Sequence, residues 1–310
     1  MLDDILNDYD NRTDSNAIIT NATLGIAGPT DYQVVTPTNI EGWEISTDAV
    51  NALLKDYGHE GYSSILNDFE ALGYGIHYLT ERGLSTEDYI EIHGKLKVRR
   101  ALVEEKRGTR AIVCGPGTGL GIACIVDGLY RDGFPFIFSS EGGHQTLAPE
   151  SVSQLRLVTK DGGSLEPKSY EEVLSHSGIR EIYNLFLRND YSSEPNYNAT
   201  AKEIVSFSKS GKDYAAIDAI ELFTEILANF CGNSVLSFNC DKVVYLWGGV
   251  LLEIPEDLLK SRFSRHYSDR RAHSGRTKRV PVVLLKNTEI PLLGCASRSK
   301  FEIEHLKNLQ

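Results

Sequence analysis

The chain has 310 residues and a formal net charge of -11, with 41% hydrophobic and 24% charged side chains. This composition excludes general disorder, and the length suffices for two lobes with cores of their own. The negative charge argues against nucleic acid or an anionic membrane as a partner, since both attract basic surfaces.

The first predicted elements alternate between strand and helix. Residues 22–27 read as a buried strand closed by a Gly-Pro turn, and Ser46 caps a helix that runs through Leu54. A short strand at residues 64–66 ends at Asn67-Asp68, and a helix follows from Phe69 towards Tyr78. This alternation favours an α/β fold.

A glycine-rich turn joins two apolar segments within residues 111–126, which predicts a β-hairpin. The turn contains Gly117, Thr118 and Gly119, and lacks the Gly-Lys-Ser/Thr of a Walker loop. Its backbone N–H groups and the Thr118 hydroxyl are suited to a phosphate. A purely structural tight turn is the alternative.

The later elements continue the pattern. Residues 213–230 carry a helical apolar stripe, residues 241–247 form a strand before Gly248-Gly249, and residues 280–285 form another strand. A polar helix closes the chain at residues 297–310, whereas residues 189–212 read as a polar surface excursion.

Two polar clusters accompany the glycine turn. Asp68 is placed to act as a general base for a hydroxyl, although an aspartate before a helix is commonly an N-cap. Glu141 and His144 offer acceptors and donors for a polyol, while a satisfied core histidine is the alternative. No third ligand accompanies that pair, so no metal site is expected. Together the clusters point to phosphoryl transfer onto a hydroxylated small molecule.

A basic stretch and the cysteines suggest no further function. Residues 260–279 are rich in arginine and lysine, and in this acidic chain we interpret them as a solvated helix and loop. The five cysteines show no Cys-x-x-Cys spacing and indicate buried free thiols in a reducing compartment. No signal peptide or membrane span is evident, so a cytoplasmic protein is expected.

The motifs resemble, in order, those of the bacterial-type glucokinase family, whose members have a two-lobed actin-like ATPase (ribonuclease H-like) sugar kinase fold. The matching segments span Leu24 to Gly294 and are Leu24-Gly-Ile-Ala-Gly-Pro29, Ile65-Leu-Asn-Asp-Phe69, Gly115-Pro-Gly-Thr-Gly-Leu-Gly121, Ser140-Glu-Gly-Gly-His144, Glu171-Glu-Val-Leu-Ser175, Trp247-Gly-Gly-Val250 and Pro291-Leu-Leu-Gly294. Where the family has a glycine after Leu-Ser, this chain has His176.

The resemblance implies roles for particular residues. Asp68 matches the catalytic base, and Asn67, Glu141, His144 and Glu171 match residues that hydrogen-bond the other sugar hydroxyls. On the nucleotide side, the matching residues are Gly117, Thr118, Gly119, Gly248 and Gly249.

The resemblance also implies a first phosphate loop of the type Asp-x-Gly-Gly-Thr near the N-terminus, and nothing before Asn21 supplies one. The small lobe is therefore expected to be incomplete. An incomplete gene product of an active kinase is one explanation, and a short paralogue that binds sugar without efficient turnover is the other.

The sequence thus predicts ATP-dependent phosphorylation of glucose to glucose 6-phosphate, the first step of glycolysis, with Mg²⁺ required. A catalytically impaired sugar-binding regulator and a kinase for another hexose are the alternatives. Residues 1–80 and 297–310 are expected to form the small lobe and residues 81–296 the large lobe. A homodimer is left open.

Overall fold

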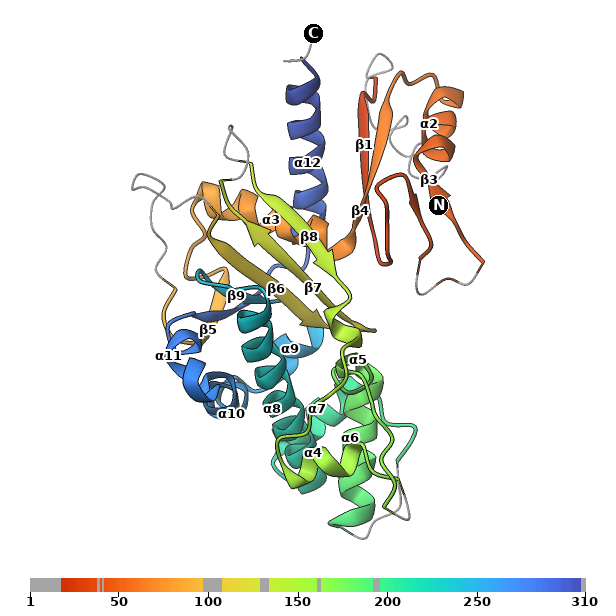
Figure 1. Cartoon of the computed structure of the whole chain (residues 1–310). Helices are drawn as coiled ribbons and strands as arrows, with labels where there is room; N and C mark the ends of the chain where they lie inside the picture. Colours follow the sequence, from red (N-terminus) through yellow and green to blue (C-terminus); the bar gives the residue numbers. More distant parts are fainter. Residues whose placement is uncertain are drawn as a thin grey trace. The chain divides into compact units, whose positions relative to one another are not determined.

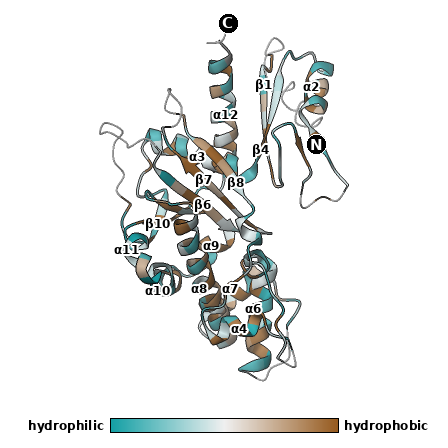
Figure 2. Ribbon diagram, in the orientation of Figure 1, coloured by the Kyte–Doolittle hydropathy of each residue, from teal (hydrophilic) through white to brown (hydrophobic). Residues whose placement is uncertain are grey.

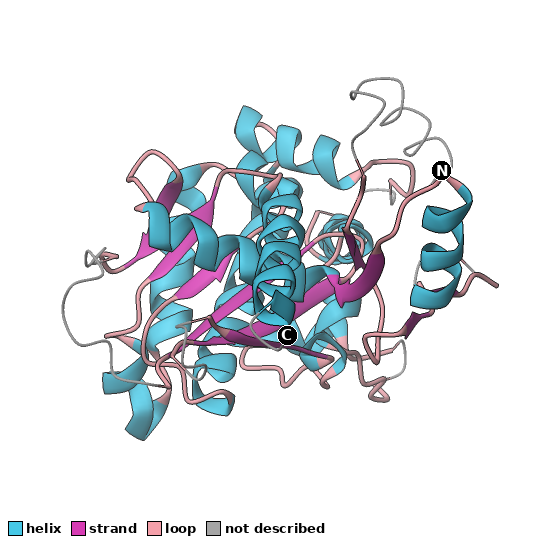
Figure 3. Cartoon of the chain, turned by 90° about the horizontal axis from the view of Figure 1, so that it is seen from above, coloured by secondary structure: helices cyan, strands magenta, loops and turns pink. Residues whose placement is uncertain are grey.

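The computed structural model describes residues 18–37, 40, 42–96, 108–128, 134–160, 163–191 and 196–307. It divides into two compact units, Met1–Thr80 with Glu289–Gln310, and Glu81–Thr288 (Figure 1). Both units contain helices and strands. Figure 3 shows the two kinds of element in the chain, and the α/β class is confirmed. The prediction that no phosphate loop precedes Asn21 concerns a segment of which residues 1–17 lie outside the described part.

The first unit is built on a parallel strand pair with helices beside it. Strand β1 pairs with β4 so that Ile26 lies opposite Asn67. The short strands β2 and β3 pair antiparallel. Val50 and Leu54 are buried on helix α2 and form a small core with apolar residues that include Leu24. The elements are β1 (Asn21–Ile26), β2 (Val34–Val35), β3 (Ile45–Ser46), α2 (Thr47–Asp56), β4 (Tyr62–Asn67), α3 (Asp68–Arg82) and α12 (Ile290–Lys307).

The starts of two helices in this unit can be compared with the prediction. Ser46 caps α2 as expected, because its hydroxyl accepts the Ala49 N–H at 3.2 Å. Helix α12 begins at Ile290, seven residues before the predicted start at residue 297. Pro291 does not prevent this, since a proline within the first helical turn lacks only an N–H that would be unpaired there.

The second unit is organised around a six-stranded mixed sheet with the strand order β5-β10-β9-β6-β7-β8. Strand β9 runs parallel to both β6 and β10, and the other pairs are antiparallel. The predicted hairpin is confirmed as β6 and β7, whose last pair is Pro116 with Leu120. The strands are β5 (Tyr89–His93), β6 (Arg110–Pro116), β7 (Leu120–Val126), β8 (Phe136–Ser140), β9 (Val244–Leu246) and β10 (Val282–Leu285).

Helix α8 forms much of the core of this unit, and strands β6 and β7 contribute to the same cluster of buried residues. Figure 2 shows apolar colouring on β6, β7 and α8. The predicted helix is therefore confirmed, and Asp213 caps it. The remaining helices are η1 (Gly142–His144), α4 (Val152–Leu157), α5 (Tyr170–Val173), α6 (His176–Asn189), α7 (Ala201–Ser210), α8 (Tyr214–Ser237), α9 (Gly249–Glu253), α10 (Glu256–Ser268), η2 (Arg271–His273) and α11 (Ser274–Thr277).

The predicted surface excursion at residues 189–212 is wrong, because helix α7 lies within it. Thr200 and Glu203 form a capping box at its start, and Ile204 and Val205 are fully buried. The polar composition concealed a helix that buries one narrow face. Residues 192–195 of that stretch lie outside the described residues.

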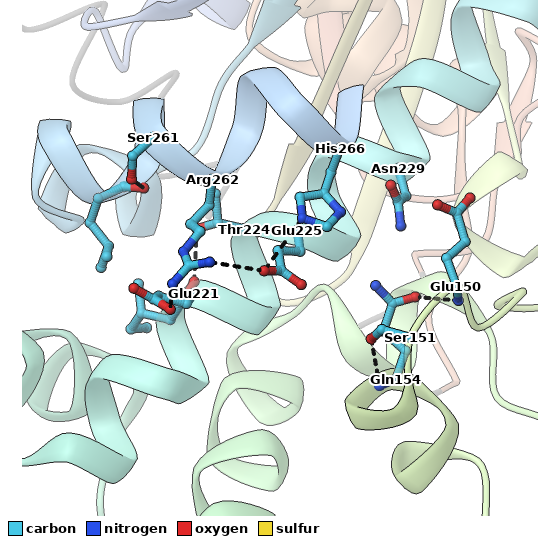
Figure 4. A network of polar contacts seen from close by, with 12 residues as sticks. Glu150, Ser151, Gln154, Glu221, Thr224, Glu225, Asn229, Ser261, Arg262 and His266 are labelled. Carbon is cyan, nitrogen blue, oxygen red and sulfur yellow. Dashed lines mark hydrogen bonds and ion pairs between the residues drawn. The ribbon is translucent and has the colours of Figure 1, made fainter. Parts of the chain in front are cut away.

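The basic stretch is also more than a solvated surface. Arg270 is only 8% exposed, and its guanidinium donates to the Asn229 carbonyl oxygen of α8 at 2.8 Å. On α10, Arg262 pairs with Glu221, and His266 Nε2 lies 3.4 Å from Glu225 (Figure 4). These contacts attach α10 and the following turn to α8.

The five cysteines are free thiols, as predicted, and all except Cys295 are buried. Burial raises the pKa of Cys124 to about 11 and that of Cys240 to about 12, so these thiols stay protonated. Among the described residues, no helix has both the length and the apolar character needed to span a membrane.

Candidate functional site

The glycine turn connects β6 to β7 in the second unit. Its N–H at Gly117 donates to the Gly119 carbonyl oxygen at 2.7 Å, and the Gly117 carbonyl oxygen accepts the His176 N–H at 3.0 Å. Thr118, at the tip, is exposed. The turn is thus tight and is hydrogen-bonded to the backbone of His176. Its middle residue, Thr118, is open to solvent.

The second cluster begins where β8 ends. Glu141 precedes the 3-10 turn η1, and His144 ends it. His144 Nε2 lies 3.6 Å from Glu141 Oε2, and both side chains are more than half exposed. His144 is therefore not a core histidine, and the exposed pair is accessible to a polar ligand.

Glu171 joins this cluster from the short helix α5. Its Oε1 lies 3.7 Å from His144 Nε2, which places His144 beside two carboxylates. Its Oε2 accepts the backbone N–H of Leu120 at 2.9 Å, directly after the glycine turn. Glu171 thus contacts both His144 and the hairpin, a connection that sequence spacing could not reveal.

Helix α5 is held in place by a cap at its start and by the hydrogen bonds of Tyr170. Ser169 and Glu172 form a capping box, and hydrogen bonds from Ser169, chiefly its backbone N–H, lower the pKa of the Glu172 carboxyl. The Tyr170 N–H donates to the Gln145 carbonyl oxygen at 2.9 Å, and its hydroxyl accepts from Asn233 at 3.2 Å. These supporting residues were not predicted from the sequence, although the Ser-x-x-Glu pattern of Ser169 and Glu172 indicates such a cap.

A pair of glycines lies at the same end of the sheet's strands as the turn of residues 117–119. Gly248 and Gly249 follow β9, and a Cβ on Gly248 would lie 2.6 Å from the Pro116 carbonyl oxygen. Gly248 has φ 151°, which disfavours other residues. The end of β6 and the start of α9 are consequently adjacent.

Asn67 and Asp68 lie in the first unit, where β4 meets α3. Asn67 Oδ1 accepts the Phe69 N–H at 2.9 Å, and its Nδ2 donates to the Gly28 carbonyl oxygen at 3.1 Å. Asp68 Oδ1 also accepts the Phe69 N–H, at 3.0 Å. Helix α3 begins at Asp68, so both the residue before the helix and its first residue accept the Phe69 N–H.

The structure thus groups the sequence-predicted residues by unit. Glu141, His144 and Glu171 come together beside the turn of residues 117–119. Among the described residues, no group of three or more His, Cys, Asp or Glu side chains could hold a metal ion.

Comparison with known proteins adds independent information. The family model described as Glucokinase matches residues 1–300. A glucokinase of Synechocystis sp. is 30% identical over 308 residues, which cover 91% of this chain and 80% of that protein. A glucokinase of Saccharophagus degradans is 29% identical over 277 residues, covering 89% of this chain and 79% of that protein.

Solved structures agree. The glucokinase of an Antarctic psychrotroph has a TM-score of 0.69 at 25% identity, covering 90% of this chain and 79% of that one. The glucokinase of Balamuthia mandrillaris, solved with glucose, has a TM-score of 0.73 at 18% identity, covering 96% and 82%. These likenesses confirm the expected actin-like sugar kinase fold.

Proposed function

The chain belongs to the glucokinase family, and on that premise we propose that Asp68 accepts the proton of the glucose 6-hydroxyl as it attacks the γ-phosphorus of ATP. The protein is an ATP-dependent hexose kinase, a phosphotransferase acting on an alcohol group. The observation that carries the assignment of the hexose and nucleotide residues within the second unit is the contact of Glu171 with both the hairpin after the glycine turn and His144.

On the nucleotide side, we propose that the turn of residues 117–119 contacts the ATP phosphates. The Gly117 and Leu120 N–H groups already have acceptors within the protein. The backbone N–H groups of Thr118 and Gly119, with the Thr118 hydroxyl, are the donors proposed for phosphate oxygens. Gly248 and Gly249 would lie against the nucleotide, where the absence of side chains lets a ligand approach the backbone.

On the sugar side, Glu141, His144 and Glu171 would bind hydroxyls other than the one that reacts. Carboxylates accept hydrogen bonds from hydroxyls, and a neutral imidazole can donate one and accept one. Holding several hydroxyls fixes the orientation of the reacting oxygen, which is a large part of catalysis in phosphoryl transfer.

In the first unit, Asp68 would serve as the base and Asn67 as a hydroxyl contact. The Asn67 amide already accepts from Phe69 and donates to Gly28, so the protein itself fixes its orientation. A carboxylate held at a helix start is suited to general base catalysis, because it needs only to accept the proton as the oxygen attacks.

Three further assignments are proposals on the same premise. Mg²⁺ would arrive on the ATP phosphates and neutralise part of their charge during transfer. The protein would work in the cytoplasm, where buried free thiols such as Cys231 stay reduced. A homodimer is the proposed oligomeric state, and light scattering of the purified chain tests it.

A coupled assay tests the proposed reaction. ATP consumption by the purified chain is expected to require both glucose and Mg²⁺, with glucose 6-phosphate as the product. A panel of hexoses at equal concentration tests the sugar specificity. Sugar binding in calorimetry without any turnover would instead support a catalytically impaired sugar-binding protein.

A further inference from the structure

We propose that Glu171 is also a positioning residue for the phosphate-binding turn, so that one carboxylate links the hexose residues to the nucleotide residues within the second unit. This inference rests on the proposed function of residues 117–119. It adds to the hydroxyl contact already assigned to Glu171 a separate role carried by its other oxygen.

The two carboxylate oxygens of Glu171 lie in different surroundings. Oε2 accepts the Leu120 N–H at 2.9 Å, and Leu120 is the first residue of β7 after the turn. Oε1 lies 3.7 Å from His144 Nε2. A hydrogen bond to a carboxylate is stronger than one between neutral groups. The contact of Glu171 with the Leu120 N–H therefore holds this end of the turn more strongly than a neutral acceptor would.

The other end of the turn is attached to the same segment. The His176 N–H donates to the Gly117 carbonyl oxygen at 3.0 Å, five residues after Glu171. This contact uses the backbone, so it does not depend on the histidine that replaces the family's glycine at position 176. Both ends of the turn are therefore fixed by the segment from Glu171 to His176.

Gly119 allows the carboxylate to approach the turn. A Cβ at position 119 would lie 2.5 Å from Glu171 Oε2 and 3.1 Å from its Cδ. At Gly117, a Cβ would meet no atom of the described residues within 4 Å. The two glycines flanking Thr118 thus differ, because only Gly119 is required by the position of Glu171.

As a consequence, hexose binding and nucleotide binding should both depend on the Glu171 side chain. Because Glu171 is one-third exposed, a bound hexose can contact it while Oε2 still holds the turn. Removing the carboxylate should therefore weaken nucleotide binding even when no sugar is present. A residue that only bound sugar would have no such effect.

The first experiment compares Glu171→Ala with Glu141→Ala, whose carboxylate also neighbours His144 but, among the described residues, accepts no hydrogen bond from the turn. Affinity for a non-hydrolysable ATP analogue is measured by calorimetry without sugar. Glu171→Ala is expected to lose about tenfold, equivalent to roughly 1.4 kcal/mol. Glu141→Ala is expected to keep wild-type nucleotide affinity while losing glucose affinity. Glu171→Gln should recover much of the nucleotide affinity, because its amide oxygen can still accept the Leu120 N–H.

A second readout does not depend on any ligand. In protein labelled with ¹⁵N-leucine, the Leu120 amide resonance should move in Glu171→Ala and in Gly119→Ala, and stay in place in Glu141→Ala and Gly117→Ala. An unchanged Leu120 resonance in Glu171→Ala, or equal losses of nucleotide affinity in Glu171→Ala and Glu141→Ala, overturns the proposal. Absence of hexose phosphorylation by the wild type, with nucleotide binding still dependent on Glu171, contradicts the proposed function and supports the positioning role.

Discussion

The α-carbon of Gly115 lies directly against the carbonyl oxygen of Trp247, so close that a Cβ at position 115 would be 1.6 Å from that oxygen. The Trp247 N–H also donates to the Cys114 carbonyl oxygen at 3.0 Å. This approach brings the ends of β6 and β9 together. As a result, the turn of residues 117–119 and the Gly248-Gly249 pair share one edge of the sheet.

Substituting Gly115 should consequently damage the fold. Gly115→Ala forces β6 away from β9, and we expect a loss of at least about 3 kcal/mol in the free energy of unfolding, since overpacking a rigid backbone contact is costly. Urea denaturation measures this. Gly275→Ala is the matched control, because a Cβ there meets no atom within 4 Å in the described part of the chain and its helix favours alanine. Equal unfolding midpoints for both variants would contradict the assigned contact.

Asp68→Asn tests the assignment of the base. The amide keeps the size of the side chain and its acceptor for the Phe69 N–H, but it cannot take up a proton at neutral pH. We expect kcat to fall by about 10²–10⁴-fold, with glucose affinity in calorimetry changed by less than about threefold. Near-normal turnover of this variant would show that another group removes the proton.

His93 should make stability depend on pH. Burial lowers its pKa below the ordinary 6.5, and a backbone hydrogen bond at Lys278 opposes this only in part. Nδ1 contacts Ser264 Oγ at 3.2 Å, and the ring meets the edge of Tyr267. A lowered pKa favours the neutral form in the folded state. Its stabilising contribution is therefore complete above pH 6.5 and is lost as the pH falls from there through the folded-state pKa.

The comparison variant is His93→Gln, which cannot titrate in this range. The difference in unfolding free energy between wild type and variant should shrink when the pH is lowered from 7.5 to 5.5. Urea denaturation at the two pH values gives this difference directly. A difference that stays constant or grows would mean that the folded-state pKa of His93 is not lowered.

Arg270 should be a stabilising residue despite its charge. Its guanidinium donates to the carbonyl oxygens of Asn229 and Asp269, and it is almost fully buried. We expect Arg270→Met to reduce the free energy of unfolding by about 3 kcal/mol, because buried carbonyl groups lose their donors. The exposed Arg265, substituted in the same way, is expected to change it by less than about 0.5 kcal/mol. Similar losses of unfolding free energy for Arg270→Met and Arg265→Met would mean that the Arg270 guanidinium is solvated rather than buried.

Local patterns predicted much of the fold. The cap at Ser46, the hairpin around Thr118 and the long helix after Asp213 each follow from a signal within a few residues, and all three are confirmed. Helix α7 was missed because its polar surface hides a single buried face centred on Ile204. The start of α12 at Ile290 was missed because the helix was predicted from the polar stretch that begins at residue 297.

By itself, the sequence determined the α/β class, the family and the identity of the candidate residues, since ordered motifs and short-range periodicity are written along the chain. Tertiary structure alone decided that Glu171, 51 residues beyond Leu120, accepts its N–H, and that Arg270 is buried against α8. Such contacts join residues that are far apart in the sequence and meet only when strands and helices pack together. A pattern of neighbouring residues therefore cannot indicate them.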